Sequence, residues 1–172
     1  MEALKTVTIS KRAELAAKGG HPWIYGSEIK GKDEGIEPGE IVRVLSGKGK
    51  FIGSGFYNEH SKITVRIIST NANDRFDDAF WKRRVSYALD YRLQVMRPED
   101  YDNMRIIFGE ADQIPGLTVD RFGDVLSVQV LSLGIEKNKD IILNSLIEVL
   151  RQHGLPVSCV YEEGYPYDME SS

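Results

Sequence analysis

Residues 109–123 read Gly-Glu-Ala-Asp-Gln-Ile-Pro-Gly-Leu-Thr-Val-Asp-Arg-Phe-Gly, and they lie between two apolar runs of the chain. Glycine and proline favour turns, and the charged side chains among them favour the surface over a core. The flanking segments 104–108, 117–120 and 125–131 are rich in β-forming residues, and the Gly-Asp pair at 123–124 is a turn signal. We therefore predict a defined loop that joins tightly connected antiparallel strands.

Helical patterns lie on both sides of these strands. Residues 71–78 contain three aspartates, which favour a helix start, and Pro98 ends the apolar repeat that follows. A second helix is predicted over 135–152, with Gly154 closing it and a strand near 157–161 after it. Its predicted buried residues are Ile141, Ile142, Leu146, Val149 and Leu150. The order helix, strands, helix, strand predicts a small α+β layer.

The chain has one cysteine, Cys159, which excludes an internal disulfide and any site built from several cysteines. Its apolar neighbours suggest a short buried strand, and free cysteines are commonly buried. We therefore expect an inert, buried thiol at this position in preference to a lone nucleophile.

The first 70 residues have a different pattern, with short β-prone runs separated by turn clusters. Ser10 is suited to cap a helix over 11–18 that stops at Gly19 and Gly20. Strands are predicted at 6–9, 23–25, 41–45, 51–57 and 63–68. Closure into a small β-barrel would remove the exposed edges that such short strands otherwise present. Gly53 and Gly55 share one strand face, which permits close approach of another backbone and is typical of a tight barrel corner.

Composition and charge set limits on function. The chain has 172 residues, is 41% hydrophobic and carries a formal net charge of −4. Residues 1–70 hold 11 basic and 8 acidic side chains, whereas residues 71–172 hold 11 basic and 18 acidic ones. A basic first module is compatible with phosphate contacts, although a charge of +3 is small for a nucleic-acid binder. Neither a bilayer-spanning stretch nor a secretion signal is present, so we expect a cytoplasmic protein without membrane association.

Several motifs together resemble a known family. Residues 38–44 and 52–58 look like a PUA domain, a small RNA-binding pseudo-barrel. With Gly20-His21-Pro22-Trp23, residues 57–61 and the segments within 105–123, the chain resembles the N-terminal half of S-adenosylmethionine-dependent ribosomal RNA (cytosine-C5) methyltransferases. The resemblance implies a PUA-like barrel over residues 1–71, a central α+β domain over 72–163 and a tail at 164–172 outside the match.

The resemblance also implies which partners and which cofactor the parent enzyme uses. Ribosomal or other structured RNA would be the partner, and homodimers occur in the family. S-adenosylmethionine would serve the parent enzyme, in a Rossmann-type catalytic domain that is expected to lie outside this chain. Residues 46–50 lack the spacing of a phosphate or dinucleotide loop, and the surroundings of Cys159 do not match the family's catalytic cysteine.

Candidate RNA contacts are concentrated in the first module. The residues nominated are Lys11, Arg12, His21, Trp23, Asn58, His60, Lys62 and Arg66. Basic side chains would contact phosphates, and His21 with Trp23 could stack on an unpaired base, although a barrel-core position is favoured for Trp23. Glu59 replaces a proline that is usual in the family, and its negative charge argues against phosphate contact at that turn.

The carboxylates of the 109–123 loop are candidates for acid–base chemistry or for a divalent cation. Their spacing lacks the alternating oxygen ligands of a calcium loop, so a structural role is favoured and no catalytic, cofactor or metal site is predicted. The residues concerned are Arg105, Glu110, Asp112, Asp120 and Arg121. Three functions stay open: an RNA-recognition half of a methyltransferase that is not catalytic alone, a stand-alone enzyme that uses this loop, and a dimerisation or assembly module.

Overall fold

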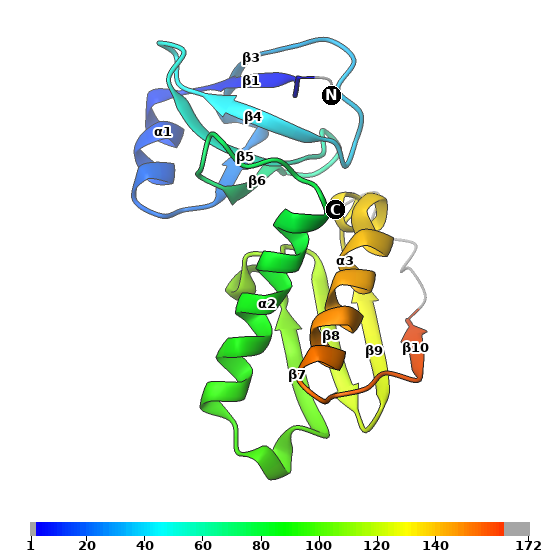
Figure 1. Cartoon of the computed structure of the whole chain (residues 1–172). Coiled ribbons are helices and arrows are strands. Elements are labelled where there is room, and N and C mark those ends of the chain that lie inside the picture. Colours follow the sequence, from blue (N-terminus) through cyan, green and yellow to red (C-terminus); the bar gives the residue numbers. More distant parts are fainter. Residues whose placement is uncertain (1–2, 164–172) are drawn as a thin grey trace. The chain divides into compact units, whose positions relative to one another are not determined.

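The computed structural model describes residues 3–163, which form two compact units (Figure 1). The first unit runs to Asp74 and the second begins at Arg75. Sequence patterns placed a boundary after residue 71, near this division. The tail predicted at 164–172 lies outside the described residues.

The first unit is a curled six-stranded sheet with one helix. Its elements are β1 (Thr6–Ile9), α1 (Lys11–Lys18), β2 (Trp23–Tyr25), the 3-10 helix η1 (Gly26–Glu28), β3 (Ile29–Lys32), β4 (Ile41–Leu45), β5 (Phe51–Tyr57) and β6 (Ile63–Ser69). The strand order is β2-β6-β5-β4-β1-β3, with β1 parallel to β4 and the other neighbours antiparallel. Because β2 and β3 are joined by η1 alone yet form the two ends of the sheet, the sheet must curl back on itself.

Local sequence explains most of this unit. Ser10 caps α1, since its hydroxyl accepts from the backbone N–H of Ala13 at 3.2 Å, and the predicted helix over 11–18 is confirmed. The five predicted strands are also present, and β6 extends one residue further. Strand β3 was not predicted because Ile-Lys-Gly-Lys contains a single apolar residue and therefore no alternation. Its pairing with β1 is decided by tertiary structure.

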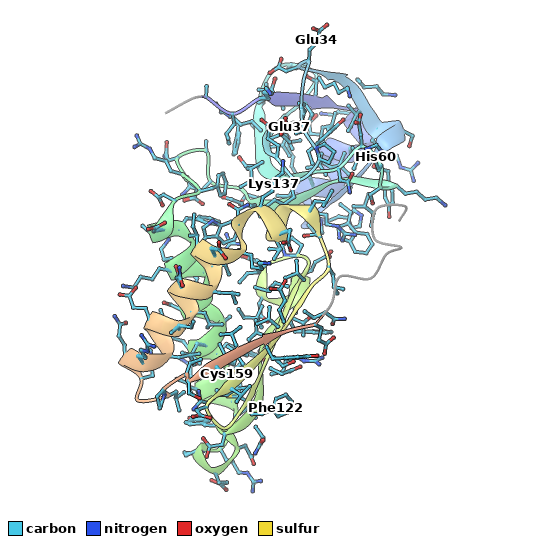
Figure 2. The ribbon with its side chains drawn as sticks, turned by 90° about the vertical axis from the view of Figure 1, so that its right-hand side faces the viewer. Glu34, Glu37, His60, Phe122, Lys137 and Cys159 are labelled. Atoms are coloured by element: carbon cyan, nitrogen blue, oxygen red, sulfur yellow. The ribbon has the colours of Figure 1, made fainter. Side chains whose placement is uncertain are left out.

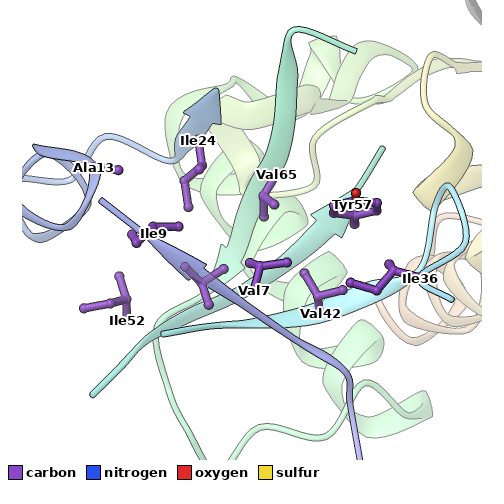
Figure 3. Close-up of a cluster of buried hydrophobic side chains, with 10 residues drawn as sticks. Val7, Ile9, Ala13, Ile24, Ile36, Val42, Ile52, Tyr57 and Val65 are labelled. Atoms are coloured by element: carbon purple, nitrogen blue, oxygen red, sulfur yellow. The ribbon is translucent and has the colours of Figure 1, made fainter. Parts of the chain in front are cut away.

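The core of this unit lies inside the curl (Figure 3). It is built mainly from β-branched side chains: Val7, Ile9, Ile24, Ile36, Val42, Val44, Ile52 and Val65, with Ala13 and Tyr57. The favoured core position for Trp23 was wrong, because on β2 the side chain that points inward is that of Ile24, which is fully buried. Side chains alternate along a strand, so Trp23 and Tyr25 lie on the outer face.

Gly53 and Gly55 mark the place where β5 and β6 approach closely. A Cβ atom at Gly53 would lie 2.9 Å from the carbonyl oxygen of Ser69, and one at Gly55 would lie 2.9 Å from the Cα of Ile67. The register of the two strands shifts between Ser54 and Gly55. Together these facts describe a β-bulge at which the two strands approach closely.

The second unit is a four-stranded sheet with two helices on one face (Figure 1). Its elements are α2 (Asp78–Val95), η2 (Pro98–Asp100), β7 (Asn103–Phe108), η3 (Gly109–Asp112), β8 (Leu117–Phe122), β9 (Val125–Val130), α3 (Leu133–Gln152) and β10 (Cys159–Glu162). The strand order is β10-β9-β8-β7, with β7, β8 and β9 antiparallel and β10 parallel to β9. This is the predicted α+β layer. No helix among residues 3–163 combines the length and the apolarity needed to cross a membrane.

Two burial predictions in this unit were wrong. Ile141 is 37% exposed, because it lies on the solvent side of α3. Cys159 is exposed, as is the whole of β10, which forms one end of the sheet. An edge strand has a neighbour on one side only, so an apolar sequence there need not be buried.

Candidate nucleic-acid interface

Three aromatic rings and one guanidinium gather on the outer face of β2 and β6. The His21 and Trp23 ring centroids are 5.8 Å apart, and those of His21 and Tyr25 are 6.5 Å apart. Arg66, the register partner of Trp23 on β6, places its guanidinium carbon 5.4 Å from the Trp23 ring centroid. We call these four residues the β2 surface. His21 and Tyr25 are exposed, and Trp23 is half-buried.

The β2 surface has the chemistry of a stacking platform for nucleotides. Aromatic rings at a strand face can stack on bases of any sequence, and arginine adds a cation–π interaction and a phosphate contact. Because Arg66 packs against Trp23, the indole is oriented before any ligand arrives. Sequence reasoning nominated three of the four residues and missed Tyr25, which the alternation of β2 could have revealed.

The turn between β5 and β6 adjoins this surface. The backbone N–H of Gly26, directly after β2, donates to the carbonyl oxygen of Lys62 at 3.2 Å, so Lys62 lies beside the end of β2. The side chain of Asn58 accepts from the backbone N–H of His60 at 3.0 Å and thereby shapes the turn. The Nε2 of His60 lies 3.8 Å from Glu59. The structure therefore brings the nominated Lys62 beside the β2 surface.

Lys11 and Arg12 lie at the other end of α1. The backbone N–H of His21 donates to Ala16 near the helix C-terminus, whereas Lys11 and Arg12 form the first turn. Glu14 accepts a 2.8 Å hydrogen bond from Lys18 and lies 3.5 Å from Lys11. The hydrogen bond from Lys18 lowers the pKa of the Glu14 carboxyl, with a smaller contribution from Lys11. The structure thus does not join the α1 cations to the β2 surface.

A polar groove that sequence reasoning missed lies beside β3. It has a volume of about 340 Å³ and is lined by Gly26, Ile29, Lys30, Gly31, Lys32, Tyr57, Glu59 and Thr64. We call it the seam groove, because β3 is one edge of the curled sheet and Tyr57 and Thr64 belong to β5 and β6. Lys32 donates to the Tyr57 hydroxyl at 3.0 Å, and its ammonium lies 3.8 Å from Glu59. The Tyr57 hydrogen bond and the nearby Glu59 charge raise the pKa of Lys32.

The carboxylates of the 109–123 loop are engaged in structural contacts. Asp120 accepts two hydrogen bonds from Arg105, at 2.8 and 3.2 Å, and this contact raises the pKa of the arginine. Asp112 accepts from the backbone N–H of Phe108 at 2.6 Å and from Arg92 at 3.0 Å. Such paired carboxylates stabilise a loop and are poorly placed to act as free acids or bases.

Glu110 and Arg121, the other two nominated loop residues, also take part in hydrogen bonds within the second unit. Glu110 lies within η3, where its carbonyl oxygen accepts from the N–H of Gln113 at 3.0 Å. Arg121 is only 3% exposed, and it donates to the carbonyl oxygens of Leu155 and Pro156 at 3.4 and 3.1 Å. In the part of the chain that the structure describes, His, Cys, Asp and Glu form no group of three that could hold a metal ion.

Parts of the chain are similar to known proteins. Residues 7–70 match a PUA-like domain. A ribosomal RNA large subunit methyltransferase from Deinococcus radiodurans is 36% identical over 126 residues, which cover 71% of this chain and 31% of the relative. Ribosomal RNA large subunit methyltransferase I from Klebsiella pneumoniae is 30% identical over 156 residues, covering 91% of this chain and 38% of the relative. The chain thus spans about a third of the length of these curated relatives.

Solved structures share the fold of the described units. A protein from Streptococcus mutans, assigned as a SAM-dependent methyltransferase, matches with a TM-score of 0.74 and 14% identity. The match covers 94% of this chain and 44% of that structure. A second structure, assigned as a methyltransferase in complex with SAH, matches with a TM-score of 0.75 over 94% of this chain and 43% of its own, also at 14% identity.

Proposed function

Since the chain is homologous to ribosomal RNA large subunit methyltransferases and carries a PUA-like domain, we propose that it binds structured RNA for an enzyme of that kind. Its relatives extend well beyond the matched region. In this proposal the catalytic step, methylation of cytosine carbon 5 with S-adenosylmethionine as donor, belongs to a domain outside the residues described here. The role of this chain is to hold the RNA and present it to that domain.

The observation that carries the proposal is the β2 surface. The exposed His21 ring lies near both Trp23 and the exposed Tyr25, and Arg66 lies against the indole. An unpaired base can stack on this aromatic group, while Arg66 and the adjacent Lys62 contact the phosphates on either side. The recognition is therefore expected to favour a loop or bulge over a regular duplex, whose bases are already stacked.

The charge distribution favours the first unit as the RNA-binding one. Residues 1–74 contain 11 basic and 9 acidic side chains, a net charge of +2, whereas residues 75–163 contain 11 basic and 15 acidic ones, a net charge of −4. Phosphate contacts release counterions, so binding by the first unit should weaken as salt rises. With few basic residues available, the salt dependence should be moderate.

The test is binding of a fluorescent ribosomal RNA hairpin to the 172-residue chain at 50 and 200 mM salt. Wild-type affinity should fall with salt, and Trp23→Ala should weaken binding about tenfold, because loss of one stacked base costs about 1–3 kcal/mol. Phe51→Ala is a control at a half-buried aromatic residue on β5, outside the β2 surface. Affinity that is independent of salt and of Trp23 would overturn the proposal.

Self-association is a second candidate function, and the open face of the second unit favours it. Phe108, Phe122 and Tyr161 are 52%, 55% and 61% exposed. The strand registers place all three on the face opposite α2 and α3, since Glu162, next to Tyr161, bonds to Lys139 of α3. Exposed aromatic groups of this kind are common at protein interfaces. Sedimentation velocity across a range of concentrations tests this candidate, with Phe122→Ser expected to favour the monomer.

The stand-alone enzyme has no comparable support among residues 3–163. Asp112 and Asp120, which such an enzyme would use, are both bonded to arginines. Neither sheet is a doubly wound parallel sheet of the kind that holds S-adenosylmethionine.

A further inference from the structure

We propose that the seam groove holds one unpaired guanine of the RNA bound by this chain. The inference rests on the proposed function, since the base must be delivered by an RNA that the first unit already binds. It names a ligand for a site distinct from the β2 surface. It also gives a role to Glu59, which is unsuited to a phosphate contact.

The groove has the size and the position to receive a single base. Its volume of about 340 Å³ is near the lower limit for pockets that hold small molecules, and it is too small for a duplex. Its walls come from η1, β3, the end of β5 and the following turn, and the start of β6. Gly26 lines the groove and directly follows Tyr25 of the β2 surface, so the groove begins where the β2 surface ends. A strand of RNA that stacks on β2 can therefore continue into it.

Three polar side chains converge within the groove. Tyr57 is 2% exposed, and its ring forms part of the core while its hydroxyl oxygen points out of the cluster (Figure 3). Lys32 donates to that hydroxyl at 3.0 Å and remains protonated at neutral pH. The carboxylate of Glu59 lies 3.8 Å from the Lys32 ammonium, and its other oxygen lies 3.8 Å from His60.

This set of groups matches the Watson–Crick edge of guanine. A carboxylate can accept two hydrogen bonds side by side, and guanine offers N1–H and the N2 amino group in that arrangement. Lysine donates only, and the guanine O6 is an acceptor adjacent to N1. Adenine has no carbonyl oxygen for the lysine. Uracil has a single N–H for the carboxylate, and cytosine offers its amino group alone.

The backbone of β3 leaves room for the rest of the nucleotide. As an end strand, β3 pairs with β1 alone among the described strands, so its other edge faces the groove. A Cβ atom at Gly31 would meet nothing within 4 Å, and the neighbouring Lys30 is exposed. The open space at Gly31 accommodates a ribose, and Lys30 can neutralise its phosphate.

The experiment compares RNA hairpins that differ in one unpaired loop nucleotide: guanosine, inosine, 2-aminopurine or adenosine. Inosine lacks the N2 amino group, whereas 2-aminopurine lacks both O6 and the N1–H. We expect the wild-type 172-residue chain to favour guanosine over the other three by about tenfold, the discrimination typical of a bidentate contact. Glu59→Gln should reduce the preference over inosine to less than twofold. Affinity for the guanosine hairpin should therefore fall, whereas affinity for the other three hairpins should not, because the variant removes a negative charge from an RNA-binding surface.

Glu34→Gln is the matched control, since it removes the same charge from an exposed residue of the β3–β4 connection that does not line the groove (Figure 2). Lys32→Met is the second variant, and it should reduce the preference for guanosine over 2-aminopurine. Thermal melts followed by circular dichroism check that Glu59→Gln, Glu34→Gln and Lys32→Met have equal thermal stability.

The outcomes separate the two proposals. Salt-sensitive, Trp23-dependent binding without a guanosine preference, or with equal effects of Glu59→Gln and Glu34→Gln, overturns the guanine site and leaves the proposed function standing. Binding that depends on neither salt nor Trp23 overturns the proposed function itself. A guanosine preference that Glu59→Gln and Lys32→Met each reduce supports both.

Discussion

The guanidinium of Arg66 lies 5.4 Å from the ring centroid of Trp23, and the two residues are register partners on β6 and β2. A strand pair with 3.3–3.4 Å rise per residue holds such neighbours in fixed positions, so the cation and the indole are oriented by the sheet. The pair therefore offers RNA a base-stacking face and a phosphate contact at one point. The stacking by Trp23 and the phosphate contact by Arg66 can be tested separately.

Arg66→Gln should weaken RNA binding and reduce the slope of log affinity against log salt by about 1, because one phosphate contact is lost. Fluorescence anisotropy titrations between 50 and 300 mM salt measure this slope. Arg43→Gln is the control, since Arg43 lies 5.1 Å from the Phe51 ring in a similar arrangement on another strand pair. Equal slopes for Arg66→Gln and the wild-type chain would show that Arg66 does not contact phosphate.

Gly55→Ala should destabilise the first unit by about 1–3 kcal/mol, the usual effect of forcing an extra group into a packed site. The new methyl group would lie 2.9 Å from the Cα of Ile67, and backbone atoms cannot move aside as a flexible side chain can. Gly47→Ala, at a position open to solvent, should leave stability within about 0.5 kcal/mol. Urea unfolding followed by Trp23 fluorescence in a Trp81→Phe background reports on this unit. Equal midpoints for the two variants would contradict the close packing of β5 against β6.

Arg121→Met should destabilise the second unit by about 1–3 kcal/mol. The buried guanidinium donates to the carbonyl oxygens of Leu155 and Pro156, and its removal leaves these acceptors without a donor. Arg97→Met is the control, because the ion pairs of Arg97 with Glu99 and Asp100 are exposed. Trp81 fluorescence in a Trp23→Phe background follows the unfolding. If both arginine variants were equally stable, Arg121 would not anchor the connection between α3 and β10.

Acid should destabilise helix α1 through Glu14, which pairs with Lys11 and Lys18 of the same helix. Its folded-state pKa is lowered, first by the hydrogen bond from Lys18 and then by Lys11, so its contribution to stability is present above the unfolded-state pKa. That contribution is lost as the pH falls through the lowered folded-state pKa. Thermal melts from pH 6 to pH 3 should therefore show a smaller acid-induced decrease for Glu14→Gln than for the wild-type chain. Glu34→Gln, which alters an exposed carboxylate, should follow the wild-type curve.

Cys159 should react with an aromatic disulfide reagent in the native protein at a rate close to that of the urea-unfolded chain. The residue is exposed on the edge strand β10, so no opening of the structure is required. The absorbance of the released thiolate measures the rate. Strong protection in the native state would show that β10 is covered in solution.

Short-range patterns were sufficient to predict much of the fold. The Ser10 cap, the strands around Gly53 and Gly55 and the loop after Phe108 all follow from turn chemistry and from alternation along a strand. Burial was harder to predict. Trp23 is large and apolar, yet Ile24 takes the core position because only one face of β2 points inward.

The candidate site was predicted in part. His21, Trp23 and Arg66 were nominated from their chemistry, and the sheet brings them together. The seam groove was missed because Lys32 and Glu59 are far apart in sequence and β3 carries no apolar repeat.

The amino-acid order by itself determined the helices, most strands and the turns, because these depend on backbone preferences and on the spacing of apolar residues over a few positions. Only the tertiary structure decided which strands are neighbours, which residues lie at an edge and which distant side chains meet. The Trp23–Arg66 contact, the seam groove and the exposure of Cys159 all result from strand order, and the strand order within each unit depends on burying the core of that unit. No local pattern encodes that arrangement, since each strand could satisfy its hydrogen bonds with several alternative neighbours.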